Sequence, residues 1–543
     1  MTSSPAKPER LIKRYEVVPD QITPLNIQTK IADSGLVIIN ADDEGVTEYV
    51  AKSMQEKGYQ VVIMKMPKIV LSKSNNLPTY PLPTFDEEDI SKLFGKIVAD
   101  YPKLSLAGFI HIGSIKNEVD LFHKDEAAVL KTVFLSAKNF FLCNRRKNSF
   151  FISAVRMDGN LGLQTGENLM QGGLFGLHKS LSIEWEEEIW TKAVDLAANL
   201  SLKQAASYLI EEIFETCYSQ LEVGRCQAAK RFAPQLVETY IDDLAKQPLG
   251  LTDKDTLLVT GGGRGITAGC VIQLAKTCGC GFILLGRTDL SADLAWTNGE
   301  RDKIALKKLA LAKITGTNKD SRPKPAEIDK LVNTALNQIE IMDTIRAIKE
   351  AGGRAVYAEC DVRNLKRLRR VVEKYEQELG TITGLIHGAG AIADKKIQRK
   401  TAADFAMVFG SKVEGLATCL KALAVNKLKY LILFSSVAGY FGNGGQSDYA
   451  IANEVLNKFA FYFNNKQPSC KTVAINWGAW DGGSMVDESI RNIVKDTELK
   501  LIPPEIGANY FVEQFYRHEN PAQILVNCTD RLIRPKINNL ADL

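Results

Sequence analysis

One order of buried strands and helices occurs twice in this chain, and no other feature restricts the fold as much. The apolar run Leu36–Ile39 is followed by a turn, a helical stretch over about 46–57 and a second apolar run over 61–65. A strand–helix–strand unit of this kind places parallel strands side by side in an open sheet. Later segments correspond pairwise: 384–387 with 108–111, 431–436 with 151–155, the helix at 449 with that at 172, and 473–477 with 193–196. We therefore predict an α/β fold with two tandem doubly wound parallel sheets.

The length of 543 residues exceeds one ordinary domain. We predict an N-terminal segment over 1–30, extended at Arg14–Val18, and a first Rossmann-like subdomain over 31–250. A second Rossmann-like subdomain is expected over 251–543, with an inserted helical region at about 289–340.

Charge and composition exclude several classes of partner. The formal net charge of +4 gives no bulk attraction to nucleic acid or to a membrane surface. No run of eighteen apolar residues occurs, and the N-terminus lacks the apolar segment of a signal peptide, which favours a cytoplasmic protein. The ten cysteines are scattered, and Cys278-Gly279-Cys280 has no second cluster that would complete a metal site. Reduced thiols and no bound metal are expected.

The stretch from Leu433 to Phe463 carries the residues that predict chemistry. A buried run ends at Ser436, a glycine-rich loop follows, and a helix begins near Tyr449, with Asn453 one turn later. A phenol has a pKa near 10, so a nearby cation is needed to bring it towards the working pH. Lys412 is the candidate cation, and Ser436 could hydrogen-bond a carbonyl oxygen beside Tyr449. A serine, a tyrosine and a lysine around a carbonyl suit a hydride-transfer reductase.

A glycine-rich turn joins the first strand of the second copy to its helix. Its residues Thr260, Gly261, Gly263, Arg264, Gly265 and Ile266 let backbone N–H groups approach a pyrophosphate at a helix N-terminus. Thr267 replaces the last glycine of many dinucleotide folds, which weakens the expectation of close packing between helix and strand.

The ends of the next strands indicate which dinucleotide binds. NAD sites usually carry an acidic residue after the second strand, whereas Arg287 here would accommodate the 2′-phosphate of NADP. Asp361, followed by Val362, could bind the adenine, and the small residues Ala389 and Gly390 leave room for the cofactor. NADPH is the expected cofactor.

The first copy lacks these features. Asp42, Asp43 and Glu44 stand at its glycine-turn position and would repel a pyrophosphate. Its later helix begins at Gln171-Gly172-Gly173 and has no tyrosine. We expect the first copy to be a degenerate structural partner with no nucleotide site.

With these residues in place, the second copy resembles the short-chain dehydrogenase/reductase superfamily, and more narrowly the ketoreductases of polyketide and fatty-acid synthases. Asn453 stands where most short-chain reductases have lysine, and the lysine lies upstream at Lys412, as in synthase ketoreductases. The degenerate first copy matches their paired structural and catalytic subdomains. Gly172–Trp185, 475–483 and the insertion are similar to stretches of polyunsaturated-fatty-acid, enediyne and glycolipid-type iterative synthases. No ketosynthase or carrier sequence is present, so a discrete enzyme and an excised piece both stay open.

The resemblance implies reduction of a 3-oxoacyl thioester by NADPH, with acyl carrier protein and other synthase components as partners. Tyr449 would protonate the forming alkoxide, Ser436 polarise the carbonyl, Lys412 lower the tyrosine pKa, and Asn453 position a relay water or the lysine. A closing loop would hold Trp480, Gly482 and Met485. Asp394 keeps the last position of a Leu-Asp-Asp pattern that accompanies 3R alcohols, and Phe441 stands where a tryptophan accompanies 3S, so a (3R)-hydroxyacyl product is expected. A reductase of a free small ketone and a silent scaffold are the alternatives.

Overall fold

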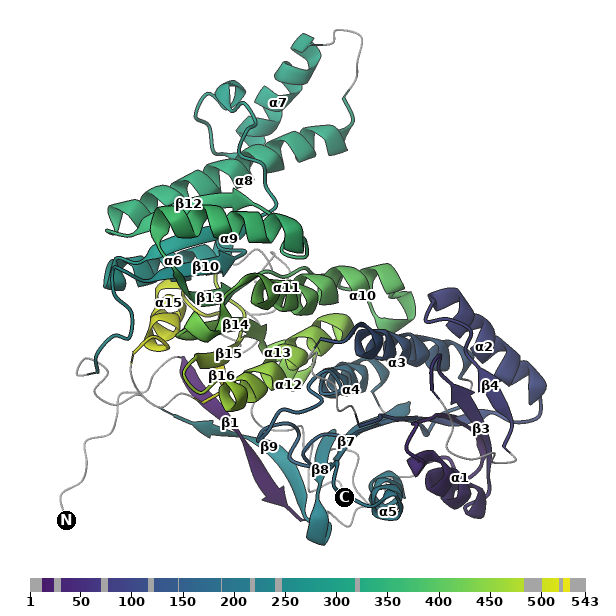
Figure 1. The fold of residues 1–543 in the computed structure, drawn as a ribbon. Coiled ribbons are helices and arrows are strands. Elements are labelled where there is room, and N and C mark those ends of the chain that lie inside the picture. The colour runs from purple at the N-terminus through teal and green to yellow at the C-terminus, as the bar shows by residue number, and fades with distance from the viewer. Residues whose placement is uncertain are drawn as a thin grey trace, which may run out of the picture.

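The computed structural model describes residues 12–23, 31–69, 77–115, 122–144, 146–186, 188–214, 220–239, 247–317, 323–482, 501–516 and 521–527. Within these residues no helix combines the length and hydropathy that crossing a bilayer requires. Both predicted Rossmann-like units are present (Figure 1). We call residues 31–250 the first half and residues 251–543 the second half.

The first half is a parallel sheet covered by helices on both faces. Its strands are β2 (Gly35–Asn40), β3 (Tyr59–Lys65), β4 (Thr79–Pro81), β5 (Leu106–Ile112), β6 (Ser149–Val155), β7 (Ile189–Leu196) and β8 (Glu222–Arg225). Its helices are α1 (Val46–Glu56), α2 (Glu87–Asp100), α3 (Lys124–Cys143), α4 (Gly173–Trp185) and α5 (Leu202–Phe214). The strands lie in the order β4-β3-β2-β5-β6-β7-β8.

The second half repeats this order as β12-β11-β10-β13-β14-β15-β16. These strands are β10 (Thr256–Thr260), β11 (Gly281–Gly286), β12 (Arg354–Glu359), β13 (Ile382–His387), β14 (Tyr430–Ser436), β15 (Lys471–Trp477) and β16 (Gln523–Asn527). The helices are α6 (Gly265–Cys278), α7 (Lys303–Thr317), α8 (Pro325–Glu350), α9 (Leu365–Leu379), α10 (Ala402–Phe409), α11 (Gly415–Ala422), α12 (Val437–Phe441), α13 (Ser447–Lys466) and α15 (Pro504–Glu513). The predicted repeat extends to single hydrogen bonds, because Asn40 contacts His111 Nδ1 at 3.0 Å and Thr260 contacts His387 Nδ1 at the same distance.

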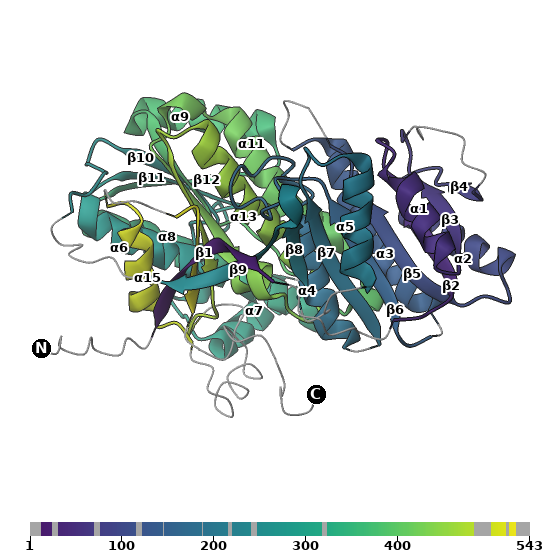
Figure 2. The same ribbon diagram turned by 90° about the horizontal axis from the view of Figure 1, so that it is seen from below.

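The two sheets are joined into one sheet of sixteen strands, which the sequence did not predict. The N-terminal segment forms β1 (Lys13–Ile22), which pairs antiparallel with β16 on one side and with β9 (Arg231–Glu238) on the other. Figure 2 shows β1 beside β9 at the centre of the molecule. The strand that begins the chain therefore links the first half to the second.

One hydrophobic core runs across both halves on a single face of the joined sheet. It contains Phe134 and Phe151 of the first half together with Ile451 and Phe459 of the second. Helices α4 and α13 meet there so closely that a Cβ on Gly176 would lie 2.3 Å from the carbonyl oxygen of Ala450. A larger side chain at position 176 would therefore separate the two halves.

The insertion forms a helical pair that projects from the second half (Figure 1). Helix α7 packs on the first part of α8 through Leu306, Ala310 and Val332. The later part of α8 lies against α6 and β12, so the insertion reaches the strand ends that face the predicted cofactor site.

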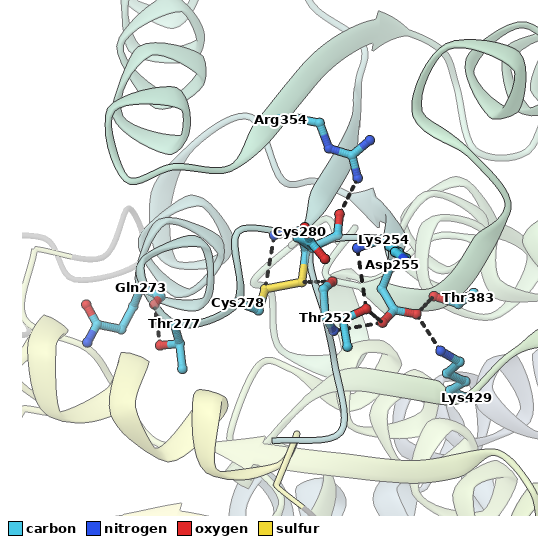
Figure 3. Close-up of a disulfide and its surroundings, with 11 residues drawn as sticks. Thr252, Lys254, Asp255, Gln273, Thr277, Cys278, Cys280, Arg354, Thr383 and Lys429 are labelled. Carbon is cyan, nitrogen blue, oxygen red and sulfur yellow. Dashed lines mark hydrogen bonds and ion pairs between the residues drawn. A yellow bond between two sulfur atoms is a disulfide. The ribbon is translucent and has the colours of Figure 1, made fainter. Parts of the chain in front are cut away.

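A disulfide closes the turn after α6 (Figure 3). Cys278 and Cys280 are bonded, and Gly279 between them has φ 63°, the left-handed conformation that ends the helix in a single residue. The expectation that all cysteines are reduced thiols is therefore wrong for this pair. The spacing of the two cysteines in the sequence did not reveal this bond.

Candidate active site

The candidate site lies at the carboxyl ends of β10, β13 and β14. The strand order reverses at β10, which has β11 on one side and β13 on the other. Ligands of doubly wound sheets bind at such a reversal, beyond the carboxyl ends of the strands. Thr260, His387 and Ser436 are the last residues of these three strands, so all three face this edge.

Tyr449 stands in the first turn of α13 and is buried, with 6% of its surface exposed. Burial raises its pKa, and hydrogen bonding from Asn453 and Ser436 lowers it. Lys412 Nζ lies 5.2 Å from the centre of the Tyr449 ring and donates a hydrogen bond to the Phe434 carbonyl at 2.8 Å. Burial lowers the pKa of Lys412 to about 7. The structure thus brings Tyr449, Ser436 and Lys412 together.

Asn453 lies one turn along α13 and is fully buried. Its amide nitrogen donates to the Tyr449 carbonyl at 2.8 Å, while its Oδ1 has no hydrogen-bond partner among the described residues. A buried acceptor without a partner is costly unless water or a ligand satisfies it. This oxygen can therefore accept a hydrogen bond from a water molecule.

His387 has a structural role that the sequence did not predict. Its Nδ1 contacts the Thr260 hydroxyl at 3.0 Å and its Nε2 donates to the Lys412 carbonyl at 2.8 Å, and burial lowers its pKa to about 4. Lys412 itself lies in a turn of π-helix, Gly410–Glu414, a widened turn that is frequent at functional sites. The histidine thereby ties the glycine turn to the segment that carries the lysine.

The glycine turn has the shape that a close phosphate contact requires. Gly261 and Gly265 have φ of 69° and 63°, and a Cβ on Gly261 would lie 3.0 Å from the Gly388 backbone. Thr267, where a glycine was expected, is buried and fills the space beside Gly388, whose Cβ would lie 2.4 Å from the Thr267 hydroxyl. The smaller residue has moved to the strand side, so helix and strand still pack closely. The free N–H groups of α6, which begins at Gly265, can bind an anion.

The predicted nucleotide contacts surround this turn. Arg264 and Arg287 are both exposed. Asp361 forms an ion pair with Arg363 at 2.8 Å, which lowers its pKa, and borders a surface depression of about 570 Å³ lined by Asn364, Leu365 and Glu414. Val362 is buried against Gly415. Ala389 N–H donates to Thr260, and a Cβ on Gly390 would lie 3.3 Å from Lys412 Cε.

Helix α8 of the insertion adds an acidic group that the sequence did not predict. The Glu340 carboxylate accepts a hydrogen bond from Gly265 N–H at 2.9 Å, and Asn337 accepts one from Arg264. A carboxylate of the protein thus occupies one N–H group of the helix terminus that would face a cofactor phosphate.

The residues expected beside the substrate differ in how exposed they are to solvent. Asp394 is exposed and accepts a hydrogen bond from Gln446 at 2.9 Å, and its charge raises the pKa of Tyr449. Phe441 packs edge-on against Tyr440. Trp480 is only 3% exposed and packs in the core against Trp477 and Gly507, because Gly507 leaves room for its ring. Gly482 has φ 75°, and Met485 lies outside the described residues.

The corresponding position in the first half is filled by the protein itself. The Asp42 carboxylate accepts hydrogen bonds from the N–H groups of Gly45, Val46 and Thr47 at 2.9–3.0 Å, at the start of α1. These N–H groups would otherwise be open to a phosphate. The degenerate character of this copy therefore has a direct physical cause.

Fold and site together define a class, a doubly wound nucleotide-binding α/β protein with a Ser–Tyr–Lys cluster at the reversal of its sheet. Residues 255–482 match the family model of the KR domain. One polyunsaturated fatty acid synthase protein of Thraustochytrium sp. is 33% identical over 431 residues, which is 76% of this chain and 15% of that protein. The polyketide synthase PksL of Bacillus subtilis is 29% identical over 35% of this chain and 4% of that protein. The chain thus spans a small fraction of these relatives.

Solved structures share the fold of almost the whole chain. An N-terminal ketoreductase from the macrolactin assembly line matches with a TM-score of 0.69 at 18% identity, covering 96% of this chain and 92% of that one. A-type ketoreductases from a modular polyketide synthase match with a TM-score of 0.66 at 17% identity, covering 96% and 94%. The fold of the two halves together is therefore shared with these solved structures.

Proposed function

We propose that the chain is an NADPH-dependent reductase that converts a 3-oxoacyl thioester, carried on acyl carrier protein, to the (3R)-hydroxyacyl thioester. The observation that carries this proposal is the buried cluster of Tyr449, Lys412 and Ser436 at the reversal of the sheet, beside a glycine turn shaped for phosphate. The carrier partner is supported by the synthase relatives alone.

NADPH, when bound, supplies the hydride that reaches C3 of the substrate. The Ser436 hydroxyl and the Tyr449 hydroxyl hold the carbonyl oxygen, and Tyr449 gives its proton to that oxygen as negative charge develops. Protonated Lys412, 5.2 Å from the phenol ring, stabilises the phenolate that remains. A water held at Asn453 Oδ1 can return a proton to Tyr449.

The preference for NADPH rests on charge. Two exposed arginines, Arg264 and Arg287, lie at the turn and after the second strand, and Asp361 is paired with Arg363. An arginine accommodates the 2′-phosphate that distinguishes NADPH from NADH.

The silent-scaffold alternative is disfavoured because the tyrosine, lysine and serine are all present and lie together. The first half shows what a silent copy looks like, with Asp42 covering its helix N-terminus.

Oxidation of NADPH with a 3-oxoacyl group on a carrier protein, compared with the same group on a small thiol, tests the proposal. We expect turnover of both and a lower KM for the carrier-bound form. Turnover of a free ketone in preference to either thioester would favour the small-ketone alternative, and no turnover at all would favour the scaffold. Chiral chromatography of the hydrolysed product should show the 3R acid, and a predominantly 3S product would contradict the stereochemical part.

A further inference from the structure

Two loops of the second half border Tyr449. One covers residues 393–400, between β13 and α10, and contains Asp394; the other covers 442–446, immediately before α13. They are bonded to each other, since Gln446 donates to Asp394 at 2.9 Å and Lys395 N–H donates to the Gly445 carbonyl at 3.0 Å. The geometry around the reacting carbonyl therefore depends on what holds this pair of loops.

A carboxylate from the other half of the molecule holds both. Glu184, in the last turn of α4, accepts the N–H of Gly445 at 2.9 Å through Oε1 and the N–H of Ile397 at 2.6 Å through Oε2. One turn earlier on α4, the Ser180 hydroxyl accepts the N–H of Asn443 at 3.2 Å. Each loop is thus anchored to a helix of the half that lacks a nucleotide site.

Helix α4 packs closely against both α13 and the 442–446 loop. Helix α4 is in direct contact with α13, where Gly173 and Gly176 allow the helices to approach closely. Gly442, at the start of the 442–446 loop, has φ 75° and would place a Cβ 2.4 Å from the Lys179 backbone. This loop therefore lies directly against α4, with no space for a side chain between them.

The 393–400 loop is also linked to α13, the helix that carries Tyr449. Buried Lys400 donates to the Ala393 carbonyl at 2.7 Å and is paired with Asp448, whose carboxylate accepts the N–H of Tyr449 at 2.9 Å. A displacement of this loop would be transmitted through Lys400 and Asp448 to the start of α13. The Glu184 carboxylate is therefore a single group that contacts both the 393–400 loop and the 442–446 loop.

We propose that Glu184 is a positioning residue of the ketoreduction, through which the first half fixes the two loops that decide how the carbonyl is presented to Tyr449. This inference rests on the proposed function. It gives the silent half a specific part in the reaction: its α4 carboxylate sets the face of the carbonyl that is reduced and leaves the cofactor site untouched.

The test compares Glu184→Ala and Glu184→Gln with Glu188→Gln, a control whose side chain is exposed just beyond α4. For Glu184→Ala we expect kcat/KM for the thioester to fall on the order of tenfold to a hundredfold, as displaced reacting groups cause. The share of the minor alcohol enantiomer should rise, while the NADPH dissociation constant stays that of the wild type. Glu184→Gln keeps one acceptor oxygen, so its kcat/KM and its enantiomer ratio should lie between those of the wild type and those of Glu184→Ala. If the alanine variant does not fold, the glutamine variant alone tests the proposal.

A second readout does not depend on activity. Hydrogen exchange at the amides of Gly445 and Ile397 should become faster in both Glu184 variants and stay unchanged in Glu188→Gln. Wild-type protein without ketoreductase activity would contradict the proposed function, whereas active Glu184 variants with wild-type exchange and enantiomer ratio would overturn this inference alone. Faster exchange with an unchanged enantiomer ratio would also overturn it, because Glu184 would then stabilise the loops without positioning the substrate.

Discussion

In the proposed ketoreduction Tyr449 supplies the proton, and burial makes its phenol a weaker acid. The pKa of Tyr449 is raised, so the residue is protonated and ready to donate at neutral pH. Replacing Tyr449 by phenylalanine removes the donor and leaves the packing of the ring. We expect a loss of kcat on the order of a hundredfold or more, with NADPH affinity unchanged by fluorescence titration. Retention of most of the activity would exclude Tyr449 from the reaction.

Lys412 should give the reaction a pH dependence in the neutral range. Burial lowers its pKa to about 7, so its proton is present below that pH and lost as the pH rises through it. Only the protonated form stabilises the Tyr449 phenolate. We therefore expect kcat for reduction to decrease as the pH is raised above about 7, as the cited pKa requires.

Lys412→Arg is the matched variant, because arginine stays charged throughout this range. Its remaining activity should lack the decline. A decline of equal steepness in the variant would assign the titration to another group.

Arg287 should set the choice of nicotinamide cofactor. Its exposed guanidinium can form a charge-assisted hydrogen bond to a 2′-phosphate, which NADH lacks. Arg287→Ala should raise KM for NADPH about tenfold or more, since such bonds contribute roughly 1.5–3 kcal/mol, and leave KM for NADH almost unchanged. Equal effects on the two cofactors would show that Arg287 does not read the phosphate.

The sequence predicted the residues of the candidate site better than the residues that fix their positions. Tyr449, Ser436 and Lys412 come from strand ends and adjoining helices of one sheet, so the repeat pattern was enough to expect them together. The parts of His387, Glu340 and Glu184 were missed, because each depends on a contact across a long sequence separation. Glu184 contacts residues more than two hundred positions away, and no local pattern signals such a bond.

At the scale of elements, the insertion contributes a residue to the candidate cofactor site. Helix α8 places the Glu340 carboxylate on the N–H of Gly265, at the helix terminus that a cofactor phosphate would approach. Two anions at one N-terminus repel each other. The cofactor therefore has to displace Glu340 or share the site with it.

Glu340→Gln removes the charge and keeps an acceptor oxygen. We expect the NADPH dissociation constant to fall about two- to fivefold at low salt, and by less at high salt, where exposed charges are screened. Isothermal titration at two salt concentrations measures this. Glu350→Gln, at the C-terminal residue of α8, changes the same charge about 15 Å away along the helix and should leave the affinity unchanged. A weaker affinity in Glu340→Gln would show that the carboxylate helps to form the site.

At the scale of the whole molecule, both doubly wound sheets were predictable, and their union was not. Each sheet follows from apolar runs and turns that recur at matching positions. The union depends on β1, a single strand whose buried residues alternate only in part, so nothing in its sequence identifies two partners. Strand pairing between distant segments is set by the edges that the rest of the fold leaves open.

Removal of residues 1–22 should destabilise both halves. Without β1, the edges of β9 and β16 lose their neighbours, and exposed edges pair with other chains. We expect a lower melting temperature in calorimetry and growth of large species in light scattering, whereas removal of residues 1–11 alone should cause neither. Unchanged melting after the longer deletion would show that the two sheets are stable without their shared strand.

The shared strand also sets an order of events during synthesis. Strand β1 is made first, and β9 becomes available once residue 238 has left the ribosome, whereas β16 ends at residue 527. At about 5–20 residues per second, the free side of β1 waits roughly 15–60 s for its second partner. During that interval a nascent chain displays an open strand edge to its neighbours on the same messenger RNA. The first half is thus complete before β16 is made, and β1 then offers the edge with which β16 pairs.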